Sequence, residues 1–170
     1  ELGEVLKIGQ LSWLSGALAL YGQQQTRGFE LGLEYASGGE MDDEGRYIIA
    51  GRPVEVIARD TEGNPEKGVQ LALELIEKEG VEMIQGPVGS AVAAALTTVA
   101  EENKMILMVD PAASAFTTGA YFNPYVFRTS RTNFDDTLVI AKYLVENVGT
   151  KFAHIGMDNA FGQGSGIALT

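Results

Sequence analysis

The residues best placed to do chemistry are serines that follow apolar, strand-like runs. Ser90 ends the turn Gly86-Pro87-Val88-Gly89-Ser90, which lies between the run around Ile84 and an alanine-rich helical pattern. A serine there is expected to cap the helix, whose first backbone N–H groups lack internal partners. These groups carry partial positive charge and suit an anion, often a carboxylate. Capping without a ligand is the alternative role for Ser90.

A second turn of this kind is Asp110-Pro111-Ala112-Ala113-Ser114, which follows the apolar run 105–109. Taken alone, Ser114 is more often a simple turn residue. If both turns lie at one edge of a sheet, they face one ligand.

The sequence offers little for catalysis. It has no cysteine, which excludes thiol nucleophiles, thiolate metal sites and disulfides. The single histidine, His154, lies in an apolar run and is expected to be structural. Neither a nucleotide-binding G-x-G-x-x-G nor a G-x-S-x-G motif is present. We expect no catalytic residue, no metal and no cofactor, and we keep an enzyme on a doubly wound α/β sheet as an alternative.

The elements that must position these residues alternate between strands and helices. Strands are predicted at 5–11, 53–59, 83–85, 105–109 and 125–128, and helices at 21–37, 64–79 and 90–103. This order is typical of an α/β, doubly wound parallel sheet, which binds ligands beyond the carboxyl ends of its strands. The apolar strand 105–109 is expected to be buried on both faces. Gly28 and Gly32 are expected to allow close packing of the first helix on the sheet.

Beyond Arg128 the pattern changes. A polar linker, 129–133, leads to a helix at 135–148 that Thr132 or Asn133 would cap. A sixth strand is predicted at 152–157, followed by a turn into a helix that stops at Thr170. We expect residues 1–128 to form an amino-terminal lobe and residues 129–170 the crossover and beginning of a second lobe. The chain would then be part of a longer protein.

Several short motifs, in this order across the chain, carry a resemblance. They are Lys7-Ile8-Gly9, Ser15-Gly16, Tyr21-Gly22, Asp60 with Asn64-Pro65, the two serine turns, Phe127-Arg128-Thr129, Tyr143 and Phe161-Gly162-Gln163-Gly164. Together they resemble the type I periplasmic solute-binding proteins of ABC transporters, in particular the branched-chain amino acid and amide-binding (Leu/Ile/Val-binding) group. The resemblance implies two similar, Rossmann-like lobes that close over a ligand without converting it.

The resemblance also implies polar contacts. Ser90 would take the ligand carboxylate with its hydroxyl and the neighbouring amides. The Ala112 carbonyl would accept from a ligand amine, Ser114 would contribute its hydroxyl and amide, and Ala113 would form the wall between them.

Three aromatic residues complete the expected site. The resemblance places Tyr21 over the pocket from the first lobe and Phe161 in the closing face of the second, where a tyrosine is usual. Because Phe161 lacks a hydroxyl, a more apolar ligand is favoured. Trp13 departs from the smaller residue common nearby, and it would either stack on a ligand ring or be a loop aromatic without a ligand role.

Charge and composition limit the partners. A formal net charge of −11 argues against binding nucleic acid or anionic membranes. The resemblance implies a periplasmic or extracytoplasmic location, reached after removal of a signal peptide. The chain begins at Glu1 without Met, as a trimmed product would. The expected partners are a small-molecule ligand (an amino acid, an amide or an aromatic carboxylate) and an ABC transporter permease, with the protein a monomer. A ligand-sensing domain of a receptor or regulator is a further alternative.

Overall fold

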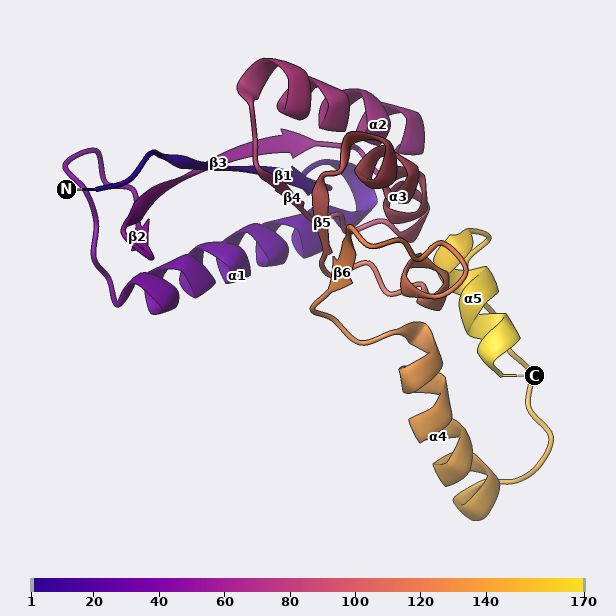
Figure 1. Cartoon of the computed structure of the whole chain (residues 1–170). Helices are drawn as coiled ribbons and strands as arrows, with labels where there is room; N and C mark the ends of the chain where they lie inside the picture. The colour runs from indigo at the N-terminus through magenta and orange to yellow at the C-terminus, as the bar shows by residue number, and fades with distance from the viewer. Residues whose placement is uncertain (1, 170) are drawn as a thin grey trace.

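A six-stranded sheet forms the centre of the computed structural model, which describes residues 2–169 (Figure 1). The strand order is β2-β3-β1-β4-β5-β6. The strands are β1 (Leu6–Ser12), β2 (Ile48–Ile49), β3 (Arg52–Asp60), β4 (Met83–Gln85), β5 (Ile106–Val109) and β6 (Val126–Arg128). Only the short edge strand β2 runs antiparallel to its neighbour among these strands. The predicted parallel α/β sheet is therefore confirmed, with one antiparallel edge.

The register brings the ends of the parallel strands together. Ser12 lies beside Asp60, Gln10 beside Gln85, and Gln85 beside Met108. The turns that follow β1, β3, β4 and β5 therefore leave the sheet at one edge, as the sequence predicts for a ligand site.

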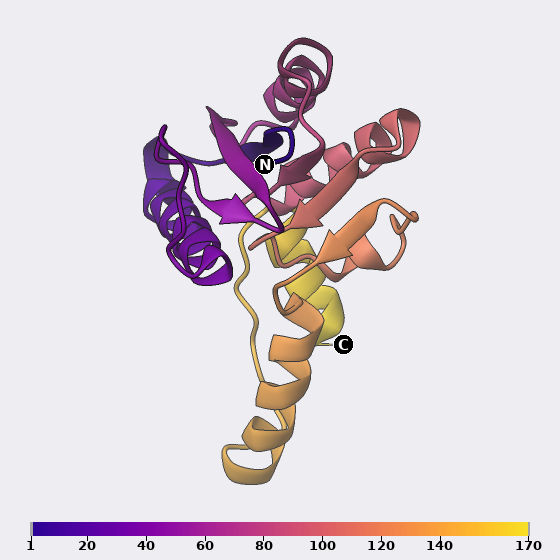
Figure 2. The ribbon, with the colours of Figure 1, turned by 60° about the vertical axis from the view of Figure 1, so that its left-hand side comes forward.

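Helices cover the two faces unequally. α1 (Ala19–Ser37), which follows the short 3₁₀ helix η1 (Gly16–Leu18), lies on one face. α2 (Pro65–Glu74), its π-helical continuation η2 (Leu75–Glu79) and α3 (Ser90–Asn103) lie on the other (Figures 1 and 2). Asn64 caps α2 as predicted, because its side chain accepts a hydrogen bond from the Lys67 amide at 2.8 Å.

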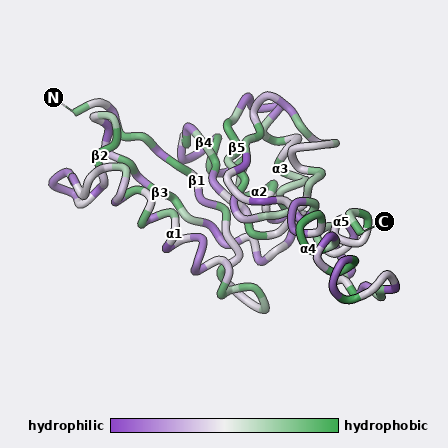
Figure 3. Tube along the Cα trace, turned by 90° about the horizontal axis from the view of Figure 1, so that it is seen from below, coloured by the Kyte–Doolittle hydropathy of each residue, from purple (hydrophilic) through white to green (hydrophobic). Residues whose placement is uncertain are grey.

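The larger part of the core lies between the sheet and α2 and α3. It is built around the fully buried side chains Leu11, Leu75, Ile84, Leu96 and Leu107. A smaller cluster under α1 contains Ile8, Leu33 and Val54. Figure 3 shows hydrophilic and hydrophobic colours alternating along α1, as expected of a helix with one apolar face.

Two packing predictions are wrong. In β5, Leu107 and Val109 are buried but Ile106 is 43% exposed, because α1 lies over β1 and β3 and the described chain leaves this face of β5 open. A Cβ added to Gly28 or Gly32 would find no atom within 4 Å, so neither glycine touches the sheet. The close approach is at Gly22, where an added Cβ would lie 2.0 Å from the Trp13 carbonyl oxygen.

In the carboxyl-terminal part, α4 (Asn133–Asn147) extends away from the sheet, whereas α5 (Ala160–Ala168) lies next to α3 (Figures 1 and 2). A 3₁₀ turn, η3 (Ala115–Thr118), precedes β6. Thr132 is the cap of α4 and shares a capping box with Asp135. The strand predicted at 152–157 does not form, and His154 is exposed there instead of structural. A strand needs a neighbouring strand to pair with, and none of the described strands lies beside this segment.

Candidate functional site

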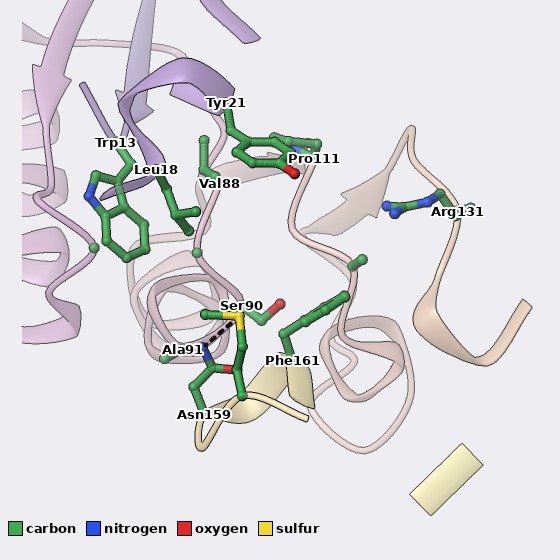
Figure 4. A pocket seen from close by; sticks show the side chains of 14 residues that line it. Trp13, Leu18, Tyr21, Val88, Ser90, Ala91, Pro111, Arg131, Asn159 and Phe161 are labelled. Carbon is green, nitrogen blue, oxygen red and sulfur yellow. Dashed lines mark hydrogen bonds between the residues drawn. The ribbon is translucent and has the colours of Figure 1, made fainter. Parts of the chain in front are cut away.

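A cavity of about 420 Å³ opens at the carboxyl-terminal edge of the sheet (Figure 4). Its volume is within the range of small-molecule pockets. Its lining residues come from six loops, the short helix η1 and the first turns of three α-helices: Trp13, Leu18, Tyr21, Gly63, Val88, Gly89, Ser90, Ala91, Pro111, Ala113, Arg131, Met157, Asn159 and Phe161. The two predicted turns therefore face one space.

Three helices begin at this cavity. Tyr21 lies in the first turn of α1, Ser90 is the first residue of α3, and Phe161 is the second residue of α5. The opening N–H groups of a helix lack intrahelical acceptors and give that end a partial positive charge. Of these three described helices, only α3 begins without a partner for these groups, because the Ala19 amide of α1 donates to the Gly16 carbonyl and the Gly162 amide of α5 donates to Asn159 Oδ1.

The guanidinium of Arg131 also belongs to the lining, and its Nε forms an ion pair with Asp136 at 3.3 Å, so its positive charge is partly compensated. The electrostatic character of the cavity therefore suits an anion, although the whole chain is acidic.

The structure corrects the prediction that the Ser90 hydroxyl caps α3. Gly89 is the N-cap, and no side chain caps this end. Ser90 is instead the first helical residue. Its Oγ accepts a hydrogen bond at 3.3 Å from the amide of Ser114, in the turn that follows β5. Among the described residues, the hydroxyl hydrogen of Ser90 has no acceptor, so it is available to donate into the cavity that Ser90 lines.

The second turn contributes less than predicted. Ala113 lines the cavity, whereas Ala112 and Ser114 are buried and lie outside its lining. Arg128, which is outside the lining, binds the backbone of both residues: its Nη1 donates to the Ala112 carbonyl and its Nη2 to the Ser114 carbonyl. Burial lowers the pKa of this guanidinium from its usual value, although the Coulombic effect of Asp135 opposes the shift. The ligand roles assigned to Ala112 and Ser114 stay predictions.

The three predicted aromatic residues all line the cavity. In Figure 4, Trp13 and Phe161 lie on either side of it, with Tyr21 above and Ser90 below. Below Trp13, the dashed line joins Asn159 Nδ2 and Met157 Sδ at 4.0 Å. Around Ser90 the walls are therefore mainly aromatic and aliphatic.

Asp60 ties together the two loops on the Trp13 side. Its Oδ1 accepts from the amides of Leu14 and Glu62, both at 2.9 Å. Burial tends to raise the pKa of Asp60, but the hydrogen bonds from Glu62, Leu14 and Ser15 and the charge of Lys67 hold that pKa below its usual value. Asp60 is thus an ionised structural anchor rather than a group facing the cavity.

Asn133 joins the Pro111–Ser114 turn to α5. Its amide donates to the Ala113 carbonyl at 2.7 Å, and its Oδ1 accepts from the Ala115 amide at 3.1 Å. Its Nδ2 donates to the Phe161 carbonyl at 3.2 Å. The side chain therefore links the end of the Pro111–Ser114 turn to α5.

Four residues that shape the site had no predicted role in it: Gly63, Arg128, Arg131 and Asn133. Arg131 and Asn133 lie in the linker that the sequence marks as polar, and Gly63 lies in the turn before the Asn64-Pro65 helix start. These signals predict a linker and a turn, but which loops meet in space depends on the strand order.

Within residues 2–169, no group of three or more histidine, cysteine or acidic side chains is placed to hold a metal ion. None of the described helices combines the length and apolar character needed to cross a membrane.

The chain is similar in sequence and in structure to proteins of one known family. A family model described as periplasmic binding protein matches residues 5–170. The Leu/Ile/Val-binding protein BraC3 of Rhizobium johnstonii is 31% identical over 160 residues, which are 94% of this chain and 41% of that protein. The Leu/Ile/Val-binding protein of Escherichia coli K12 is 26% identical over 147 residues, covering 86% of this chain and 38% of that protein.

Solved structures agree. An ABC transporter solute-binding protein of R. palustris in complex with 4-hydroxybenzoate matches with a TM-score of 0.83 and 31% identity, over 97% of this chain and 42% of that one. Another from R. palustris, in complex with benzoate, matches with a TM-score of 0.85 and 28% identity, over 97% and 43%. The chain thus spans about two-fifths of the length of these relatives. It belongs to the periplasmic binding protein family, whose members are non-enzymatic solute-binding proteins of ABC transporters.

Proposed function

We propose that the protein containing this chain is an extracytoplasmic solute receptor of an ABC transporter, and that it binds a small carboxylate in the cavity at Ser90. The bound solute would be released to the transporter permease unchanged. In this proposal, residues 1–128 are the amino-terminal lobe and residues 129–170 begin the second, which closes on the ligand by a hinge motion.

One observation carries the proposal: the Ser90 hydroxyl, three helix starts and Arg131 surround one mainly apolar cavity. A carboxylate there gains hydrogen bonds and favourable electrostatics, while the rest of a small solute contacts apolar walls. No histidine or carboxylate is among the residues lining the cavity, so the described part of the site lacks a general base.

The named relatives are consistent with a carboxylate. The curated ones are called Leu/Ile/Val-binding proteins, and the solved ones hold benzoate or 4-hydroxybenzoate. All these solutes carry a carboxylate and an apolar body. Ser90 is suited to bind the carboxylate common to both classes.

The test is calorimetric titration of the full-length protein with leucine and benzoate, with Ser90→Ala as the variant. We expect at least one of the two to bind, and Ser90→Ala to weaken that binding by about tenfold, which is about 1.4 kcal/mol. Mass spectrometry of the ligand after incubation should recover it unchanged.

Thr97→Val is the matched control, because Thr97 is a buried hydroxyl residue of the same helix that donates to the Ala94 carbonyl and does not line the cavity. It is expected to change the melting temperature but not the affinity. Equal affinities for wild type and Ser90→Ala, or conversion of the ligand, would contradict the proposal.

A further inference from the structure

We infer that this site selects a planar aromatic carboxylate, and that Trp13 is the residue that determines this selectivity. The inference rests on the proposed function, since it names the class of solute that the same cavity takes.

The loop that carries Trp13 is fixed on both sides of that residue. On one side, the Ser12 carbonyl accepts from both the amide and the hydroxyl of Thr61, each at 2.8 Å. On the other side, the Leu14 amide donates to Asp60 at 2.9 Å. The backbone of Trp13 is therefore held in place before any ligand arrives, which reduces the entropy lost on binding.

The indole lies flat against Gly63. A Cβ added to Gly63 would lie 2.3 to 2.4 Å from three consecutive atoms of the six-membered ring, Cζ2, Cη2 and Cζ3. Nearly equal distances to consecutive ring atoms place that carbon over the face of the ring and not beyond its edge. A Cβ on Gly89 would lie 3.7 Å from Cε3 and Cζ3. Two glycines thus leave the space that the indole occupies.

The part of the indole that Gly63 and Gly89 leave uncovered is the part that a ligand can reach. Trp13 is half-buried and lines the cavity, while one of its faces is covered by Gly63. In Figure 4 the indole lies across the cavity from Phe161, with Tyr21 between them at the top. A flat ring gains offset stacking or edge contacts from such walls beyond the area it buries, whereas a branched aliphatic side chain gains only the burial.

The charges favour a carboxylate without an ammonium group. Arg131 is the charged side chain among the lining residues, and its Nε pairs at 3.3 Å with Asp136, which is outside the lining. None of the described residues lining the cavity is acidic. Asp158, which lies next to the lining residue Met157, accepts from Gln163 and is outside the lining. A buried ammonium without an anionic partner costs binding energy, and the positive helix starts add to that cost. An aromatic acid avoids this cost.

The experiment compares three ligands by calorimetry on the full-length protein: benzoate, cyclohexanecarboxylate and leucine. Cyclohexanecarboxylate has the same anion and ring size as benzoate but is not planar. We expect benzoate to bind about tenfold more tightly than either of the others, since aromatic contacts contribute about 0.5–1.5 kcal/mol each. Trp13→Leu should remove most of that preference, and Trp13→Phe should retain part of it.

Gly63→Ala tests the position of the indole without touching its chemistry. Its new Cβ displaces the ring, so the preference for benzoate should fall as in Trp13→Leu. Gly45→Ala is the matched control, because Gly45 also has a positive φ (77° against 71°) but has nothing within 4 Å of an added Cβ. Circular dichroism spectra identify any variant that fails to fold, and Trp13→Phe then decides the result.

The outcomes separate the two proposals. If leucine or cyclohexanecarboxylate binds as tightly as benzoate, or if Trp13→Leu leaves the preference within about twofold, the inference is wrong while the receptor function stands. If none of the three ligands binds, the proposed function fails and this inference fails with it.

Discussion

Asp60 shows how one side chain can organise a binding site without facing it. Its carboxylate accepts from one amide in the loop after β1 and from one in the loop after β3. These loops carry Trp13 and Gly63, which are in contact. The position of the indole thus depends on the ionised carboxylate of Asp60.

We expect Asp60→Asn to lower the free energy of unfolding of the full-length protein by about 1 kcal/mol at neutral pH. The amide oxygen can still accept a hydrogen bond, but the charge that strengthens both bonds is lost. Urea unfolding measures the difference, and Asp43→Asn is the control, because Asp43 is an exposed acidic residue in a loop away from the cavity.

The lowered pKa of Asp60 also predicts how the difference in unfolding free energy between wild type and Asp60→Asn depends on pH. The pKa of Asp60 is lower in the folded chain than its ordinary value of 3.8, so its stabilisation is fully present above that value. It is lost as the pH falls through the lower, folded pKa. The difference between wild type and Asp60→Asn should therefore be constant from neutral pH down to about pH 5 and shrink below about pH 4. A difference that grows on acidification would exclude this role.

Ser90 marks the limit of prediction at the residue scale. The turn and the helix that follows it could be predicted from the glycines, Pro87 and the alanine-rich pattern. Whether the N-cap is Gly89 or Ser90 could not be predicted, because glycine and serine both occur at this position. The choice depends on which of the two residues first adopts helical backbone angles. The shift matters, since it frees the Ser90 hydroxyl from capping and turns it toward the second turn.

At the scale of elements, apolar periodicity predicted the longer strands and the helices of the sheet region. Each of them buries one face, and the spacing of apolar residues within the element itself reveals that face. Apolar periodicity failed where burial depends on a partner. The apolar run 152–157 has no neighbouring strand, and β5 lacks a described helix over Ile106. The glycines of α1 failed similarly: the pattern marks Gly28 and Gly32, but the crossing point of α1 lies at Gly22.

Gly22 and Gly28 therefore give opposite predictions in the same helix. Gly22→Ala should lower the free energy of unfolding by about 2 kcal/mol or more, because its Cβ would lie 2.0 Å from the Trp13 carbonyl oxygen and force α1 away from the loop. Gly28→Ala should raise it by about 0.5–1 kcal/mol, because the space there is open and alanine favours the helix. Urea unfolding of both variants of the full-length protein would show this, and equal effects would contradict the packing described.

For the whole molecule, the cavity depends on contact between the sheet region and α5. Trp13 comes from the loop after β1 and Ser90 from the start of α3, whereas Phe161 comes from α5, more than 30 residues beyond β6 in sequence. No local pattern predicts that contact. Asn133 forms part of this contact, because its side chain accepts a hydrogen bond from the Ala115 amide and donates one to the Phe161 carbonyl. An added Cβ at Gly164 would lie 2.5 Å from Asn133 Nδ2, so α5 approaches this side chain closely.

Asn133→Ala should therefore affect both stability and binding. It removes two partly buried hydrogen bonds made by the side chain of a buried residue, and we expect the free energy of unfolding to fall by about 1–3 kcal/mol. Because Phe161 would lose its link to the second turn, the affinity for benzoate should fall several-fold even where the variant is fully folded. Asn147→Ala is the control: Asn147 is an exposed residue of α4 that bonds the Tyr143 carbonyl one turn earlier. Calorimetry on both folded variants measures the difference, and a destabilised Asn133→Ala protein with unchanged affinity would show that α5 is positioned by other contacts.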